Sequence, residues 1–326
     1  MVLTKLSVVR QLYLKNQLLK MIRNLSNERR DRSFSKYLQY LLARGLISVL
    51  QWTPLPLVFG FGRVAGWLCW KVMRRRRAVV RANLEVANAA IGAGLEGRMP
   101  IERQVRAVFL RNGANLMSSF RLSRMPVERQ ARHVKIEGTE LVKRTLAEGK
   151  GAIFLLAHMG PWEYLSAIGP IFEAGGAKVH IGGIYRPFNN DYLEDWYRAQ
   201  RQRLGTRMLS RREGFHKPVD HLRSGGILGI FGDQKMREGV EAPFFGRRVK
   251  TSPLPAIFHR RTGAAVIGVS FCQVGACQWV LSLKPCIGAS EHCEQSREFI
   301  TEICNQAAEA SLRKSLLDGF WLTPRF

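Results

Sequence analysis

Acidic residues are scarce in this chain: 25 Asp and Glu stand against 51 Lys and Arg, for a formal net charge of +26. Several catalytic signatures are also missing, namely G-x-S-x-G, H-E-x-x-H and the glycine spacings of a P-loop or a dinucleotide-binding fold. These absences exclude the common serine hydrolases, zincins and P-loop enzymes. The positive charge predicts attraction to polyanions, which include nucleic acids, anionic lipid surfaces and acidic carrier proteins.

The six cysteines form no C-x-x-C pair and no repeated metal-ligand spacing. This pattern is typical of reduced thiols in a protein that faces the cytosol. Cys286, His292 and Cys293 come nearest to a zinc ligand set, but their spacing fits the known patterns poorly. We therefore expect neither a metal nor a cofactor.

Residues 37–70 are mostly apolar, with Arg44 and Arg63 as the only charges and with prolines at 54 and 56. A helix needs about 20 uninterrupted apolar residues to span the hydrocarbon of a bilayer, and proline interrupts a helix at its centre. The segment therefore favours two short helices that dip into one leaflet, with a single span as the alternative. The basic run 71–77 follows two tryptophans, an arrangement typical of a cytoplasmic membrane interface.

Residues 1–36 scatter basic residues among apolar ones and show no secretory signal. Leu3, Leu6, Val9 and Tyr13 recur at near-helical spacing, which suits a basic amphipathic helix on an anionic membrane, although a solvated extension fits equally well. We divide the chain into the extension 1–36, the membrane-associated segment 37–77 and a domain at 78–326.

Residues 78–124 have the apolar periodicity of helices, and from Val134 onward expected strands alternate with expected helices. The expected strands are 134–138, 152–157, 178–185, 226–232 and 264–271, with a further antiparallel edge strand at 278–286. The expected helices are 138–149, one from Pro161, 190–204, one before Gly225, one after Ser252, and 294–317. Such alternation predicts an α/β fold whose largely parallel central sheet is flanked by helices, behind the N-terminal membrane-associated helical segment.

His158 follows a buried strand, at the carboxyl end where α/β sheets place their sites. Pro161 suits the first turn of a helix, so Glu163 falls in that first turn and His158 in the preceding loop. Because the chain turns at Met159 and Gly160, the Glu163 carboxylate can fold back to the imidazole. A carboxylate on one imidazole nitrogen leaves the other to take a proton from a substrate hydroxyl, as in acyl transfer. We predict His158 as the general base and Glu163 as its partner.

Four blocks carry a resemblance to a known family, and two shorter matches lie nearer the N-terminus. The blocks are His158-Met-Gly-Pro-Trp-Glu163, Tyr185-Arg-Pro-Phe-Asn-Asn190, Gly232-Asp-Gln234, and Pro243-Phe-Phe-Gly246 with Thr251; the shorter matches are Arg81-Ala-Asn-Leu84 and Phe109-x-x-Asn112-Gly113. In this order they resemble the bacterial lipid A biosynthesis acyltransferases, the lauroyl and myristoyl transferases of the lysophospholipid acyltransferase superfamily. The resemblance extends from about residue 41 to the C-terminus.

The resemblance implies a glycerolipid acyltransferase-like fold on the cytoplasmic face of the bacterial inner membrane. It also implies transfer of a fatty acyl chain from acyl-acyl carrier protein to a hydroxyl of a lipid A precursor. The residues that it assigns to catalysis are His158 and Glu163, and those that it assigns to substrate binding are Arg186, Asn189, Asp233, Gln234, Phe244 and Phe245. Asp233 and Gln234 also follow an apolar strand, so we expect them at the same sheet edge as His158, where they either support catalysis or form a helix cap and a structural hydrogen bond. The arginines at 198, 201, 203, 207, 211 and 212 suit an acidic carrier protein or anionic lipid.

Two departures from the family leave the donor and the acceptor open. Thr323 stands where family members commonly have a histidine, and residues 1–36 lie outside the match. The alternative is a relative that uses acyl-CoA and acylates a lysophospholipid or a phosphoinositide mannoside. A nucleic-acid-binding protein is a rival of another class. We expect no nucleic-acid partner, because the sequence has no helix-turn-helix, zinc-finger or RNA-binding signature and its densest basic run adjoins the apolar segment.

Overall fold

The computed structural model describes residues 32–92, 99–174, 176, 179–203, 205–210 and 214–326. They form two compact units. The larger takes in Leu46–Pro187 and Arg198–Phe326, and the smaller takes in 32–45 and 188–197 of the described chain. Most of residues 1–36, where the amphipathic extension was predicted, lie outside the described residues.

In the smaller unit, the start of α2 (Phe34–Trp52) meets residues that precede and begin α9 (Asp191–Gln202). Lys36 Nζ donates to the Asn189 carbonyl oxygen at 2.7 Å. The rings of Tyr37 and Tyr192 lie 5.2 Å apart, centroid to centroid, in an edge contact. Aromatic packing and a few polar contacts therefore hold this unit together.

Among the described residues up to 130, helices are the regular elements, and the helices predicted within 78–124 are confirmed. The bounds are α2 (Phe34–Trp52), α3 (Leu55–Val72), α4 (Arg74–Ile91), α5 (Ile101–Leu122) and α6 (Val127–Gln130). Pro54 is the N-cap residue of α3 and separates it from α2, so the predicted interruption at the prolines is confirmed, although the two helices are 19 and 18 residues long. Their insertion into one leaflet stays a prediction. Within the described residues, no helix combines the length and apolarity that crossing a bilayer requires.

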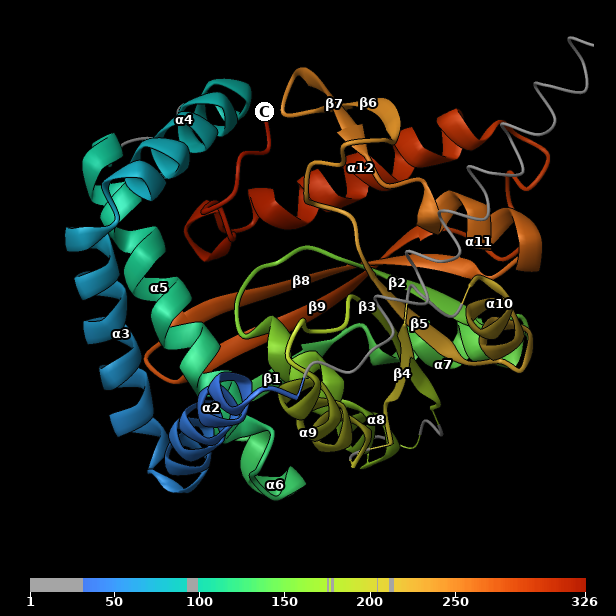
Figure 1. Cartoon of the computed structure of the whole chain (residues 1–326). Coiled ribbons are helices and arrows are strands. Elements are labelled where there is room, and N and C mark those ends of the chain that lie inside the picture. The colour runs from blue at the N-terminus through green and yellow to red at the C-terminus, as the bar shows by residue number, and fades with distance from the viewer. Residues whose placement is uncertain (1–31, 93–98, 175, 177–178, 204, 211–213) are drawn as a thin grey trace, which may run out of the picture. The chain divides into compact units, whose positions relative to one another are not determined.

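The main chains of α3 and α5 approach closely because glycines line their contact. A Cβ added to Gly62 would lie 2.5 Å from the Gly113 carbonyl oxygen, and one added to Gly66 would lie 2.2 Å from the Phe109 carbonyl oxygen. Small residues spaced four apart allow this kind of packing. As a result α3 is fixed on α5, which Figure 1 shows between α3 and the sheet.

The seven-stranded sheet of the described chain has the order β1-β9-β8-β2-β5-β3-β4. Its strands are β1 (Val134–Glu137), β2 (Ala152–Leu156), β3 (Ile181–Tyr185), β4 (Arg207–Ser210), β5 (Ile227–Phe231), β8 (Ala265–Gly275) and β9 (Gln278–Ile287). All neighbouring strands are parallel except β8 and β9. The prediction of a largely parallel sheet is therefore confirmed. The prediction that 278–286 forms an edge strand is wrong, because β1 pairs with the outer side of β9.

Helices pack on the sheet, and Figure 1 shows α12 lying across one face of it. The remaining bounds are α7 (Thr139–Ala147), η2 (Trp162–Ala167), α8 (Gly169–Ala174), α10 (His216–Arg223), α11 (Leu254–Thr262), α12 (Arg297–Arg313) and η4 (Leu316–Asp318), where η marks a 3-10 helix. Both α11 and α12 contact β2 and β8, and α5 contacts η2 and η4. The hydrophobic core is continuous from α3 through the sheet to the C-terminal residues.

Two features were absent from our sequence prediction. Strand β4 extends the sheet beyond β3. An antiparallel hairpin of β6 (Val240–Phe244) and β7 (Arg247–Thr251) forms a separate two-stranded sheet that packs on α12. Its turn holds Phe245 at a φ of 49° and Gly246 at 73°. Phe245 thus adopts a left-handed conformation that few side chains tolerate.

Candidate active site

The register of the sheet places His158 opposite Asp233. Strands β2 and β5 are parallel neighbours in which Leu156 pairs with Phe231. Each strand is followed by one small residue and then by a polar one, His158 after β2 and Asp233 after β5. The two side chains therefore emerge side by side at the carboxyl edge of the sheet, where α/β folds place their sites.

Asp233 holds both the side chain and the backbone of His158. Its Oδ1 lies 2.7 Å from His158 Nδ1, and its Oδ2 accepts the His158 backbone N–H at 2.9 Å. Burial raises the pKa of Asp233, but the positive charge of His158 and these hydrogen bonds outweigh burial and hold the pKa below its ordinary value. The carboxylate is thus ionised at neutral pH and fixes the imidazole with its Nδ1 proton toward Asp233.

This geometry changes the predicted place of Glu163. We expected its carboxylate to orient His158, whereas Asp233 is the carboxylate found at Nδ1. Glu163 forms a short ion pair with Arg201, and both side chains are largely buried. The physical reason is local: Pro161 leads directly into η2, whose first turn carries Glu163, and Arg201 of α9 meets the carboxylate there. A catalytic role for Glu163 stays a prediction.

Aromatic rings surround the imidazole. Phe231 stacks on His158 with 4.0 Å between ring centroids, and Trp162 makes an edge contact at 5.9 Å. The Phe320 ring lies 6.4 Å away. The side chain of His158 is 19% exposed. Such a site excludes most water while leaving part of the imidazole accessible, which strengthens electrostatic interactions within it.

The C-terminal residues complete the loop that carries His158. The Phe320 N–H donates to the His158 carbonyl oxygen at 2.7 Å, and the Gly160 N–H donates to the Asp318 carbonyl oxygen at 3.1 Å. Between these bonds, Met159 forms an isolated antiparallel bridge with Gly319. A Cβ on Gly160 would lie 2.1 Å from the carbonyl oxygen of Phe271 on β8, so only glycine fits there. The His158 loop is therefore clamped between β8 and residues 318–320.

Arg325 is a second polar residue that sequence reasoning did not assign to the site. Its guanidinium donates to Thr251 Oγ1 at 2.9 Å and lies 4.3 Å from the centroid of the Phe244 ring. Burial lowers the pKa of Arg325 to about 10, and attraction to Asp233 acts in the opposite direction. The electrostatic influence of Arg325 thus reaches the carboxylate that holds His158.

The other predicted substrate-binding residues fall in different surroundings. Arg186 is exposed directly after β3, the strand beside β5, and Gln234 is exposed next to Asp233. Phe244 and Phe245 are buried, with their rings 5.0 Å apart in an edge contact. Asn189 belongs to the smaller unit. The structure thus brings Asp233 to His158, places Arg186 and Gln234 at the same edge of the sheet, and puts the phenylalanines in the core.

Among the described residues, no group of three or more His, Cys, Asp and Glu side chains is arranged to hold a metal ion. The groups that are present suit proton transfer from a hydroxyl. An imidazole held at Nδ1 by an ionised carboxylate has Nε2 left to accept a proton. This pairing serves attack by a hydroxyl on a carbonyl carbon.

The pairing of His158 with Asp233 had a signal in the sequence. Ala152 begins a five-residue apolar strand six positions before His158, and Ile227 begins another six positions before Asp233. If the two strands were neighbours in a parallel sheet, equal spacing would bring the two polar residues together. Sequence alone did not say that β2 and β5 are neighbours. The sequence analysis placed Arg201 in a basic cluster but did not pair it with Glu163, and it gave Arg325 no role in the site.

Comparison with known proteins gives two findings. Residues 27–326 match the family described as bacterial lipid A biosynthesis acyltransferase. A lipid A biosynthesis acyltransferase of Haemophilus influenzae is 25% identical over 174 residues, which is 51% of this chain and 51% of that protein. The chain thus aligns with about half the length of this curated relative.

Proposed function

This chain belongs to the bacterial lipid A biosynthesis acyltransferase family, and we propose that it transfers a fatty acyl chain from a thioester to a hydroxyl group of a lipid A precursor. The observation that carries the proposal is the contact between His158 and the buried Asp233 at the carboxyl edge of the sheet. It supplies a base of fixed tautomer, as direct attack by a hydroxyl requires.

In the proposed reaction, His158 Nε2 removes the proton of the acceptor hydroxyl as its oxygen attacks the thioester carbonyl carbon. The new C–O bond forms while the carbonyl electrons move to oxygen, which gives a tetrahedral oxyanion. When the carbonyl is restored the C–S bond breaks, and the leaving sulfur takes the proton from His158 Nε2. The products are an ester and a thiol. Asp233 stays ionised and stabilises the imidazolium during both steps.

Glu163 and Arg201 have a supporting role in this proposal. Their ion pair is largely buried, and Glu163 lies in the first turn of η2, directly after the His158 loop. We assign the pair to shaping the site beside the imidazole. The exposed Arg186 at the end of β3 suits a phosphate of the lipid acceptor or the carrier side of the donor, because a guanidinium forms two parallel hydrogen bonds with such groups.

The proposed donor is acyl-acyl carrier protein. The formal charge of +26 suits an acidic carrier, and α9 contributes Arg198 and Arg201 to the predicted basic cluster. Arg201 also pairs with Glu163, so it is not solely a surface charge. Arg211 and Arg212 of the same cluster lie outside the described residues. Acyl-CoA is the alternative donor, and the activity experiment below distinguishes it from acyl-acyl carrier protein.

The proposed location is the cytoplasmic face of the bacterial inner membrane. One side of α3 packs on α5, whereas the other side exposes apolar side chains that are 50–74% accessible: Leu57, Phe61, Val64, Leu68 and Val72. At the end of this helix, Lys71 Nζ lies 5.2 Å from the centroid of the Trp70 ring. An apolar face bounded by tryptophan and basic residues is typical of a helix that lies at a membrane surface.

A charge placed on this face tests the location. Because α3 also packs into the core, deletion of residues 1–70 would expose α5. Point variants test the apolar face without removing that packing. We expect F61E with L68E to abolish cosedimentation with phosphatidylglycerol and phosphatidylethanolamine vesicles while the thermal unfolding curve is kept. V274E, which alters an exposed valine in β8, is the matched control and should still bind. Equal vesicle binding by wild type, the F61E and L68E double variant and V274E would contradict the proposed location.

Activity is tested with detergent-solubilised protein that is offered acyl-acyl carrier protein and acyl-CoA in separate assays. The acceptors are a lipid A precursor and a lysophospholipid, and H158A is the control. We expect transfer to the lipid A precursor and its loss in H158A, because the variant lacks the base. Transfer only from acyl-CoA to the lysophospholipid would move the protein to the alternative function. Full activity of H158A would contradict the proposed mechanism, in which His158 is the general base.

A further inference from the structure

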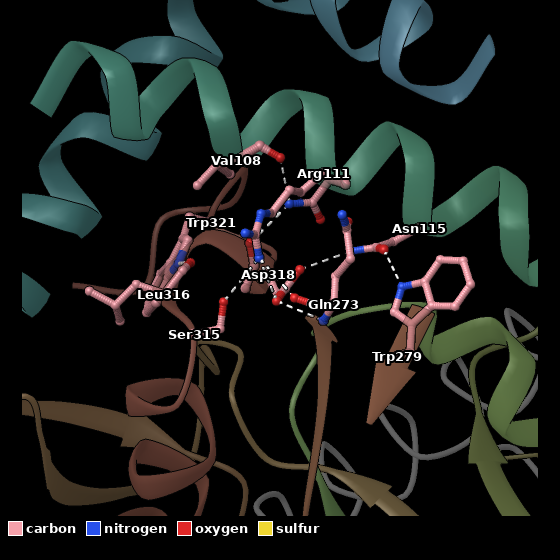
Figure 2. Close-up of polar contacts among 11 residues, drawn as sticks. Val108, Arg111, Asn115, Gln273, Trp279, Ser315, Leu316, Asp318 and Trp321 are labelled. Atoms are coloured by element: carbon pink, nitrogen blue, oxygen red, sulfur yellow. Dashed lines mark hydrogen bonds and ion pairs between the residues drawn. The ribbon is translucent and has the colours of Figure 1, made fainter. Parts of the chain in front are cut away.

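Asp318 lies at the junction of three parts of the larger unit (Figure 2). The residue is fully buried in η4. Its Oδ2 accepts hydrogen bonds from Arg111 of α5 and from the backbone N–H of Gln273 on β8, each at 3.0 Å. Its Oδ1 accepts from Asn115 Nδ2, also on α5, at 3.2 Å. One carboxylate thus joins the helical layer, the sheet and the C-terminal segment.

The same residue begins the segment that holds the catalytic loop. Its carbonyl oxygen accepts from Gly160, and the next two residues make the bridge to Met159 and the hydrogen bond to the His158 carbonyl oxygen. The side chain of Asp318 thus contacts α5 and β8, while its backbone contacts the His158 loop. A continuous run of three residues, 318–320, therefore connects this carboxylate to the backbone of the proposed base.

We propose that Asp318 is a positioning residue for acyl transfer, whose carboxylate ties the His158 loop to α5. The inference rests on the proposed function for its effect on rate, but not for its effect on the loop. Asp318 touches neither substrate nor reacting atom in this scheme. It acts through the 318–320 segment, which Asn112 of α5 also holds by donating from Nδ2 to the Gly319 carbonyl oxygen at 3.0 Å. Because α5 is packed against α3, the helical layer and the His158 loop are connected through this segment.

The donors around Asp318 are fixed, which makes an amide a poor substitute. The Gln273 N–H and the Arg111 guanidinium can only donate. Asn115 cannot turn its amide around, because its Oδ1 accepts from Trp279 Nε1 at 2.8 Å. In D318N the amide oxygen can replace only one of the two carboxylate oxygens. The NH₂ group then faces either Asn115 Nδ2 or the Arg111 and Gln273 donors, which cannot accept a hydrogen bond. A variant of almost unchanged shape therefore loosens the anchor.

The experiment compares D318N with V142A, a control that removes core packing in α7 from a fully buried valine without touching a polar contact. Hydrogen–deuterium exchange is measured on peptides covering 158–164 and 316–322, and kcat and KM are measured in the transfer assay. In D318N we expect exchange at least about tenfold faster in both peptides. We also expect kcat to fall about 100-fold, because a displacement of about 1 Å at a reacting group has that effect, while KM changes little. V142A should keep its kcat despite lower stability.

The outcomes separate this inference from the proposed function. Unchanged exchange in both peptides of D318N would overturn the positioning role, whatever the activity. Faster exchange with wild-type kcat would overturn the role in the reaction. Full activity of H158A would overturn the proposed function, and the exchange result would then still decide whether Asp318 holds the loop. If D318N does not fold, W279F removes the indole donor that orients Asn115, together with part of a buried ring. V142A remains its control for lost packing, and we expect W279F to lower kcat about fivefold and to speed exchange in both peptides, whereas V142A keeps its kcat.

Discussion

Replacement of Asp233 by asparagine tests the chemistry of the site most directly. Asp233 uses one oxygen for His158 Nδ1 and the other for the His158 backbone N–H, at 2.7 and 2.9 Å. Asparagine has a single acceptor oxygen. Because a backbone N–H can only donate, the amide oxygen should face it, and the NH₂ group should then face Nδ1. This arrangement forces the imidazole proton onto Nε2, the nitrogen that must accept a proton from the substrate.

The expected loss follows from this tautomer. When the carboxylate that orients a catalytic histidine becomes an amide, kcat falls by about 10⁴ in an acyl-transfer triad with intact geometry. We expect a fall of about 10³- to 10⁴-fold for D233N, which corresponds to about 4–5.5 kcal/mol in the activation barrier. KM should change little, because the carboxylate is buried and both of its oxygens contact His158.

The assay is steady-state acyl transfer by detergent-solubilised D233N, with circular dichroism and thermal unfolding to establish that the variant folds. D220N alters a carboxylate of α10 in the same unit and is the matched control, expected to keep wild-type kcat. A folded D233N with kcat within about threefold of wild type would refute the tautomer argument. A change confined to KM would mean that Asp233 contacts substrate.

Three further predictions concern the ion pair, the helix contact and pH. E163Q should lower kcat by about 10- to 100-fold through loss of its charged partner contact; wild-type kcat would show that the pair is dispensable. G66A should lower the free energy of unfolding by about 1–3 kcal/mol in urea titrations, because its Cβ meets the Phe109 carbonyl. G60A is the control and should be neutral or stabilising, because a Cβ at that position has nothing within 4 Å. A larger loss of stability in G60A than in G66A would contradict the packing argument. Since the pKa of Asp233 is lowered on folding from 3.8, its ionised form contributes stability above that pH and the contribution is lost as pH falls through the folded-state pKa. The difference in free energy of unfolding between wild type and D233N should therefore shrink below pH 3.8. A difference that stays constant in urea titrations from pH 7 to 3 would contradict this contribution of Asp233.

Local patterns predicted the elements well where the local signal was strong. The alternation of apolar strands and amphipathic helices after Val134 gave the α/β class, and Pro54 gave the break between α2 and α3. The short strand β4 and the β6–β7 hairpin escaped prediction. Their residues include many charged side chains and, in β6, a proline, so their strand conformation depends on pairing with neighbours.

The sequence by itself determined that His158 follows a buried strand, that Glu163 falls in the next turn, and that the motif order resembles one family. Those facts depend on neighbours along the chain. Only the tertiary structure decided which carboxylate holds the imidazole, because the register of β2 on β5 brings together residues 75 positions apart. It likewise brought Asp318, 160 positions from His158, into contact with both the His158 loop and α5. The sequence could place Asp233 at the carboxyl edge of the sheet, but strand order carries no local signal, and so only the fold showed that Asp233 is the carboxylate that contacts His158.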